Sequence, residues 1–251
     1  MATVLSGTSG ALYYKPAGTK GSFGTSDVNI GTETITVQTY LNFKVGDGVK
    51  FSVINAQTGG SGTGTLPAGL NTSDTFFVIA YTASTGALQV SATAGGSAIN
   101  ITNTGTAASP NEFQVAYADF AAVGEVQSWS FSIERENIDT TTIGQQSTQA
   151  VPFRTFIAGF ADGEGTASVF ITDEDSALAN RMVEDVIQRN QVGAAFKLYT
   201  DKKGTEALSR SIQLDAMLSG AEFNVNPDDA QLVEITFKPT EAPTFDFSTS
   251  S

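Results

Sequence analysis

Apolar and polar residues alternate most clearly just after the middle of the chain, where serines separate Trp129, Phe131 and Ile133. This period of two predicts a β-strand with one buried face. Charged residues follow, then a Thr-, Gln- and Ser-rich segment with no period, and apolar residues return between Val151 and Phe160. We therefore expect two strands joined by a long polar arm. Because uncovered loops of this length are usually functional or disordered, we expect the arm to order against another copy of the chain.

The same alternation predicts further strands on both sides of the arm. They cover residues 11–14, 113–120, 166–172, 196–199, 212–218 and 233–237. The composition of residues 162–165 (Asp-Gly-Glu-Gly) and of residues 226–229 (Asn-Pro-Asp-Asp) is typical of tight turns. From Glu241 onward the tail is polar and has no pattern, so we expect it to fray or to dock on a neighbour.

One helix is predicted, over residues 174–190. Its apolar residues recur at helical spacing and form a stripe typical of core packing, whereas Arg181 and Asp185 lie away from this stripe. The stripe consists of Leu178, Met182, Val183, Val186 and Ile187. Asp173 or Asp175 is suited to cap the start of the helix, and Gly193 to follow its end.

Residues 22–112 differ in composition from the rest of the chain. They carry two basic and five acidic residues, against 11 and 21 in the remainder. Strand-like runs recur there between turn signals, at 28–30, 34–37, 48–53, 75–81, 87–91 and 98–102. This spacing predicts a small β-sandwich or barrel. We therefore expect an inserted module at 22–112 within a main domain formed by 1–21 and 113–251.

The whole composition favours a mainly β protein, because Gly, Thr, Ser and Ala are abundant and helical periodicity is rare. There is no run of 18 apolar residues and no charged-then-apolar leader. We therefore expect a soluble chain with no membrane partner and no export signal.

Cysteine and histidine are both missing from the sequence. Their absence removes disulfides, thiolate metal sites, the commonest general base and the usual partner of a serine nucleophile. The net charge of −13 argues against a protein that grips nucleic acid, and suits a surface that repels DNA or stays soluble at high copy number. We expect no catalytic residue and no cofactor.

Local clusters offer little other chemistry. Residues 173–175 (Asp-Glu-Asp) present carboxylates that Ca²⁺ accepts, but acids at a helix start have a simpler role there. Residues 162–165 lack the ligand spacing of a calcium loop. Residues 134–136 (Glu-Arg-Glu) have no nucleophile beside them and fit surface or interface ion pairs. The glycine-rich run 59–62 has no lysine and begins no helix, so we predict neither a metal site nor a phosphate loop.

Two short stretches of the inserted module, residues 63–70 (Thr-Gly-Thr-Leu-Pro-Ala-Gly-Leu) and 94–99 (Ala-Gly-Gly-Ser-Ala-Ile), resemble a small β module that recurs in phage virion proteins. That resemblance implies a structural or decorating domain. We expect it to lie outside the main assembly of the protein.

The rest of the chain resembles the tail tube (major tail) proteins of tailed bacteriophages. The resemblance rests on the run from Trp129 through Glu134, Ile138 and Asp139 to Thr142, on residues 156–165, and on the strand pair 212–218 and 232–237. It covers 1–21 and 113–251. It implies a mainly β fold: a tail-tube-type β-sandwich or barrel with one flanking α-helix, here with an inserted small all-β, Ig-like module that the basic fold lacks.

The resemblance also implies a function. Members assemble as homohexameric rings stacked into a hollow tube, with other tail proteins at its ends, and DNA passes through the lumen without specific binding. The location implied is the virion, after assembly in the host cytoplasm. In that family the arm packs on neighbouring subunits and on the adjacent ring, and carried onto this chain it covers residues 134–155. Carried onto this chain, the interface residues are Glu134, Arg135, Glu136, Asp139, Thr140, Thr141, Thr142 and Arg154.

Two alternatives stay open. The first is an adhesion protein that binds carbohydrate through the inserted module, where Tyr40, Phe76, Phe77 and Tyr81 are the aromatic residues available for stacking. The second is the tube of a contractile injection or secretion machine. We favour a non-contractile tail, because a large external module would obstruct a close-fitting sheath.

Overall fold

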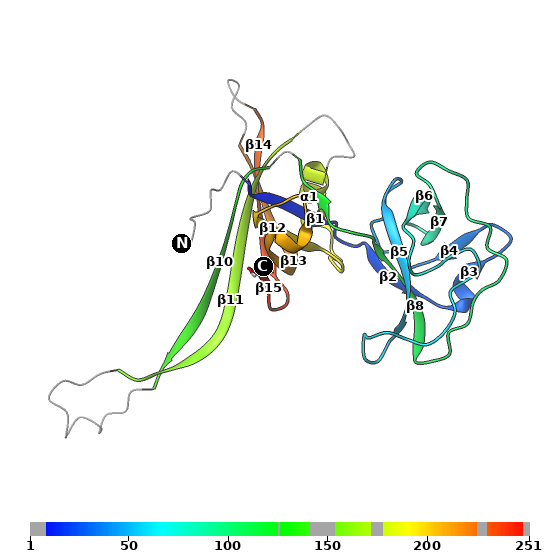
Figure 1. The fold of residues 1–251 in the computed structure, drawn as a ribbon, viewed down its shortest axis with the longest axis horizontal. Helices are drawn as coiled ribbons and strands as arrows, with labels where there is room; N and C mark the ends of the chain where they lie inside the picture. The colour runs from blue at the N-terminus through cyan, green and yellow to red at the C-terminus, as the bar shows by residue number, and fades with distance from the viewer. Residues whose placement is uncertain (1–8, 125, 141–153, 172–177, 225–229, 248–251) are drawn as a thin grey trace.

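Two antiparallel sheets and one α-helix make up the described part of the chain (Figure 1). The computed structural model describes residues 9–124, 126–140, 154–171, 178–224 and 230–247. The predicted mainly β fold class with one helix is confirmed. We call residues 20–117, which carry the second sheet, the insert, and the remainder the main body.

The first sheet forms the main body and has the strand order β10-β11-β14-β13-β12-β1-β9, with β15 paired to β13. Its strands are β1 (Ala11–Lys15), β9 (Ala121–Ala122), β10 (Val126–Asp139), β11 (Phe156–Phe170), β12 (Ala195–Asp201), β13 (Arg210–Asn224), β14 (Leu232–Pro239) and β15 (Thr244–Asp246). The helix α1 (Leu178–Ile187) connects β11 to β12.

The second sheet has the order β2-β8-β5-β6-β7-β4-β3. Its strands are β2 (Lys20–Phe23), β3 (Val28–Asn29), β4 (Thr34–Thr36), β5 (Gly48–Asn55), β6 (Phe76–Thr82), β7 (Ala87–Ser91) and β8 (Asn111–Tyr117). Short 3₁₀ turns lie at η2 (Thr25–Asp27) in the insert and at η4 (Glu206–Leu208) in the main body.

The first sheet curls so that its two halves share one core. The first residues of β13 pair with β12, and its later residues pair with β14. Phe196 of β12 and Phe237 of β14 stack with their ring centroids 4.2 Å apart, although β13 lies between the two strands. Met182 of α1 is fully buried in the same core. The apolar residues that alternate along these strands therefore lie on the inner face of the curled sheet.

The predicted turn at residues 162–165 is wrong, because these residues lie within the continuous strand β11. Their glycines serve packing. A Cβ atom on Gly165 would lie 2.3 Å from the ring of Phe237, and one on Gly163 would lie 2.9 Å from Pro239. Glycine in a strand often marks such a close approach, and the sequence pattern alone does not separate this use from a turn.

Gly165→Ala should lower the free energy of unfolding by about 1–3 kcal/mol, because the new methyl group meets a ring that is held by its stacking on Phe196. Urea denaturation followed by circular dichroism measures the change. The matched control is Gly124→Ala, where an added Cβ has no atom within 4 Å. Equal stability of the two variants would refute this explanation of the glycine.

The insert has its own hydrophobic core, separate from that of the main body. Phe51, Phe113, Val115, Ile35 and Leu88 are fully buried at its centre. The strand expected from Phe113 exists, but β8 pairs with β2 and β5 of the second sheet and not with the first. The strand predicted at 98–102 is wrong: Ile101 is buried from a loop, so the apolar signal there reflects packing without strand pairing.

The helix and the tail also differ from expectation. Of the predicted span 174–190, residues 174–177 lie outside the described residues and the helix ends at Ile187. Ile187 is exposed, so it is not part of the packed stripe. The tail does not simply fray, because β15 pairs with residues 211–213 of β13. The expected turn at 226–229 and the caps Asp173 and Asp175 lie outside the described residues.

Candidate interaction surface

A two-stranded ribbon extends from the main body (Figure 1). β10 pairs with β11 along its whole length, but β11 pairs with β14 only from Gly165 onward. Within the described chain, residues 132–139 and 156–164 therefore have only each other as strand partners. We call these two segments the ribbon. An isolated two-stranded hairpin is marginally stable in water, so this geometry requires further contacts.

Four of the charged residues predicted for the interface lie on strand β10 of the ribbon, so the polar arm does not begin at residue 134 as expected. Glu134 stands directly opposite Asp162, and Arg135 opposite Ala161. Glu136 lies at a bulge, where the register shifts between Arg135 and Asn137. Like charges directly opposite each other destabilise a strand pair, so Glu134 and Asp162 favour a cation nearby. In the described part of the chain, Arg135 forms no ion pair.

The end of the ribbon is held by polar contacts. Arg154 lies 3.9 Å from the carboxylate of Asp139, an exposed pair worth little stability by itself. The backbone N–H of Thr140 donates to the carbonyl of Thr155 at 2.8 Å, which continues the ladder by one step. Thr141 and Thr142 lie outside the described residues. The structure therefore brings six of the eight predicted residues onto or next to one hairpin.

Apolar side chains on the ribbon were not predicted as interface residues, and they are its most distinctive feature. Phe160, at the bulge, is 87% exposed, and Phe156 and Ile157 are more than half exposed. Ile138 stands opposite Ile157, so these two share one face, whereas the adjacent Phe156 points to the other face. Apolar groups on both faces need cover on both sides. The sequence did contain a signal for these interface residues. Apolar residues on a two-stranded ribbon have no core beneath them, so their presence there indicates a contact surface.

A second polar cluster fixes the insert to the main body through α1. The guanidinium of Arg181 donates to the carboxylate of Asp47 at 2.6 Å and to the carbonyl of Asn42 at 2.6 Å. The side chains of Arg181 and Asp47 are only 5% and 8% exposed. A buried pair of this kind costs stability if either partner is removed, because the other charge remains buried.

Asp185, one turn further along α1, completes this cluster. Its carboxylate accepts hydrogen bonds from the hydroxyl of Tyr14 at 2.8 Å, the backbone N–H of Ala17 at 3.0 Å and the amide of Asn42 at 3.1 Å. Burial raises the pKa of Asp185, and the three donors oppose that effect. Burial also raises the pKa of Tyr14 well above its ordinary value, with the Asp185 charge acting in the same direction.

The sequence analysis missed the role of this cluster. Arg181 and Asp185 were expected away from the apolar stripe, and in the structure both are buried against the insert. Their spacing of four residues on one helix face was the available signal. From the sequence alone, a charged helix face predicts exposure to solvent unless a second domain is known to cover it.

Other candidate sites find little support. No group of three or more metal-ligating acids occurs among the described residues, and the cluster at 173–175 lies outside them. In the insert Phe76 is buried, and the hydroxyl of Tyr81 donates to the backbone carbonyl of Leu41. Only Tyr40 of the proposed sugar-stacking residues is largely exposed. None of the helices described is long and apolar enough to cross a membrane.

Comparison with known proteins gives structural likeness only. No family model and no curated protein matches the chain. The chain is similar to a solved structure described as the tail of an empty GTA particle with C6 symmetry, at 14% identity and a TM-score of 0.39, covering 51% of this chain and 87% of that one. It is similar to a native gene transfer agent (GTA) virion structure at 13% identity, covering 51% and 88%, with a TM-score of 0.37. A structure of the SPP1 tail tube has 11% identity and a TM-score of 0.36, covering 52% and 71%.

Proposed function

We propose that this chain is a structural, non-catalytic subunit of a phage tail tube. It assembles as hexameric rings that stack into a hollow conduit for the genome, in a virion put together in the host cytoplasm. Other tail proteins bind the ends of the tube. The observation that carries the proposal is the ribbon, which projects from the main body with apolar residues exposed on both faces.

The edges of the ribbon and sheet supply the second element of the proposal. β10 is the end strand of the first sheet, so one side of its 14 residues has no strand partner among the described residues. Such an edge pairs readily with another chain. A contact between two different surfaces repeats from copy to copy, and it closes into a ring or continues as a filament according to its rotation.

The charges of the ribbon fit a contact between different surfaces. Glu134 and Asp162 share one face, and Arg135, the next residue along the strand, points to the other. When one ribbon lies over the next copy, Arg135 can neutralise the two opposed carboxylates of its neighbour. The overall charge of −13 suits a lumen that repels phosphate groups, so DNA passes without specific binding.

We propose that the insert, expected from the sequence at 22–112, is a separate domain on the outside of the tube and that the tail is non-contractile. The first residues and the last strands of the main body, within 1–21 and 113–251, would then form the tube wall. The buried cluster around Arg181 fixes the angle at which the insert projects.

Electron microscopy of the purified chain over a concentration series tests the proposed function. We expect hollow tubes or six-fold rings, with extra density on the outside for each insert. Addition of preformed tube ends controls for a requirement for initiation. If the chain stays monomeric even with such ends present, the assembly proposal is wrong.

A further inference from the structure

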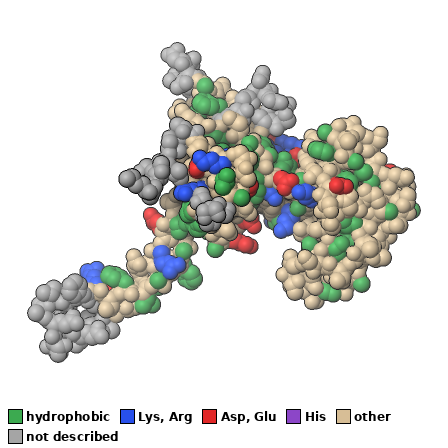
Figure 2. Space-filling view, viewed as in Figure 1, with side chains coloured by type: hydrophobic (Ala, Val, Ile, Leu, Met, Phe, Trp, Pro, Cys, Tyr) green, Lys and Arg blue, Asp and Glu red, His purple; other side chains and the backbone are tan. Residues whose placement is uncertain are grey.

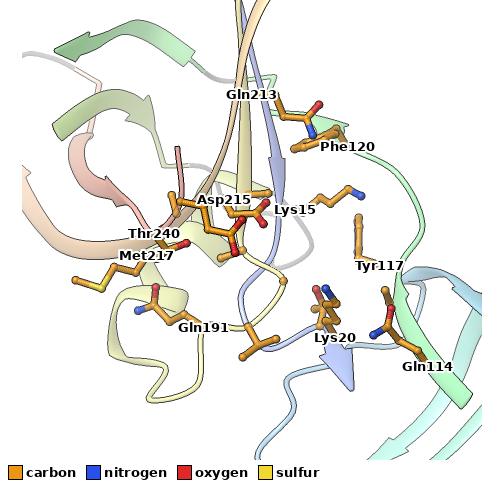
Figure 3. A pocket seen from close by; sticks show the side chains of 18 residues that line it. Lys15, Lys20, Gln114, Tyr117, Phe120, Gln191, Gln213, Asp215, Met217 and Thr240 are labelled. Carbon is orange, nitrogen blue, oxygen red and sulfur yellow. The ribbon is translucent and has the colours of Figure 1, made fainter. Parts of the chain in front are cut away.

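A groove of about 630 Å³ lies where the main body meets the insert (Figure 3), and none of the residues that line it belongs to the ribbon. Its walls come from β1, β8 and β13, three strands that are far apart in the sequence. A volume of this size is within the range of small-ligand sites, which often lie between domains. The cluster around Arg181 and Asp47 holds the two domains together, so the groove is preformed.

Two lysines in this groove differ from all the others in the chain. Six of the eight lysines form ion pairs with carboxylates. Within the described residues, Lys15 and Lys20 form none, and both line the groove. Figure 2 shows Lys and Arg side chains gathered beside the boundary between main body and insert. In a protein with twice as many acidic as basic residues, two lysines without ion pairs that line the same groove indicate a site for a negative group.

Lys15 is the better placed of the two to bind such a group. Its ammonium lies 4.8 Å from the centre of the Phe120 ring and, in Figure 3, between Phe120 and Tyr117. Burial lowers the pKa of Lys15, which means that its charge is incompletely compensated by the chain itself. The carboxylates of Asp119 and Asp215 act in the opposite direction, but neither lies within ion-pair distance of it.

The remaining polar groups restrict the class of ligand. The side-chain amides of Gln114 and Gln213 make no hydrogen bond within the described chain and offer both donors and acceptors. Asp215 and Glu241 add carboxylates to the same groove. A polyanion such as an acidic peptide or a nucleic acid would be repelled by these carboxylates. A ligand with one negative charge and many hydroxyl groups suits all of these groups. Its charge pairs with a lysine, and its hydroxyls donate to the carboxylates and accept from the amides.

We propose that this groove binds a saccharide that contains an acidic sugar, with the sugar carboxylate on Lys15 and Lys20 and its hydroxyls on Gln114, Gln213 and Asp215. Tyr117 supplies an aromatic surface and a hydroxyl at the wall formed by the insert. This site differs from sugar stacking within the insert, and it does not depend on tube assembly, because one chain forms the whole groove.

Calorimetric titration of the full chain at monomeric concentration tests the proposal. The probes are a disaccharide of glucuronic acid and N-acetylglucosamine, a sialic acid trisaccharide, a neutral N-acetylglucosamine tetramer and a glutamate tetrapeptide. We expect at least one acidic saccharide to bind with Kd of about 1 mM or lower, and the neutral tetramer at least about tenfold more weakly. Lys15→Met should weaken the acidic saccharide by about tenfold or more, as expected for loss of one charge-assisted hydrogen bond.

The matched control is Lys203→Met, which removes the same charge from an ion pair with Asp201 outside the groove and should leave binding unchanged. Three results would overturn the proposal. These are no saturable binding of either acidic saccharide up to about 10 mM, equal binding by Lys15→Met, or tighter binding of the glutamate peptide. Circular dichroism of each variant shows whether it is folded, so loss of structure is not mistaken for loss of the site.

Discussion

Replacing Phe156, Ile157 and Phe160 by serine should abolish assembly of the chain and leave the monomer folded. These side chains are more than half exposed, so they contribute little to the stability of the isolated subunit. In an assembly that covers the ribbon, each contributes about 1–2.5 kcal/mol, because half or more of each side chain still leaves water. Loss of all three removes about 3 kcal/mol or more and should therefore weaken association by at least about a hundredfold, since each 1.4 kcal/mol is a factor of ten.

Sedimentation velocity and electron microscopy measure this loss directly, and urea denaturation should show an unfolding free energy within about 0.5 kcal/mol of the parent chain. The control is Ile30→Ser, which removes a similarly exposed apolar residue from the insert and should leave assembly intact. Tubes formed by the triple variant at the parent concentration would show that the ribbon is not the assembly element.

The second large effect is expected at the cluster between α1 and the insert. Arg181→Met should lower the free energy of unfolding by about 3–5 kcal/mol, because the buried carboxylate of Asp47 loses its counter-charge. The double variant Arg181→Met with Asp47→Asn should recover much of this loss, since neither residue of the pair then carries a buried charge. The side-chain amide oxygen at position 47 can still accept the hydrogen bond from the backbone N–H of Lys44.

Lys44→Met supplies the matched control for this prediction. Lys44 pairs with Glu184, so it also joins the insert to α1, but the side chains of this pair are 35% and 56% exposed. Its removal should cost less than about 1 kcal/mol. Urea denaturation of the four chains, followed by circular dichroism, completes the comparison. A loss below about 1 kcal/mol in Arg181→Met would mean that solvent reaches Asp47 and that the cluster does not fix the insert.

Elements whose signal is local could be predicted from the amino-acid sequence. Alternation at Trp129, Phe131 and Ile133 predicted a strand, because a half-buried strand needs an apolar residue at every second position. The helix around Met182 and the last strands of the main body followed in the same way, and so did the mainly β class and the existence of a hairpin that starts with this strand. Six of the eight predicted interface residues lie on or beside that hairpin.

Features that depend on contacts between distant segments could not be predicted in this way. Gly163 and Gly165 were read as turn residues, and the reason for them is the approach of Pro239 and Phe237 from β14. Arg181 and Asp185 were expected only to lie away from the apolar stripe, and both are buried by contacts with residues of the insert more than 130 positions away in the sequence. Exposure of the ribbon's apolar residues likewise depends on where β14 stops pairing with β11. A local pattern records which residues avoid water, and only the assembled fold shows what covers them.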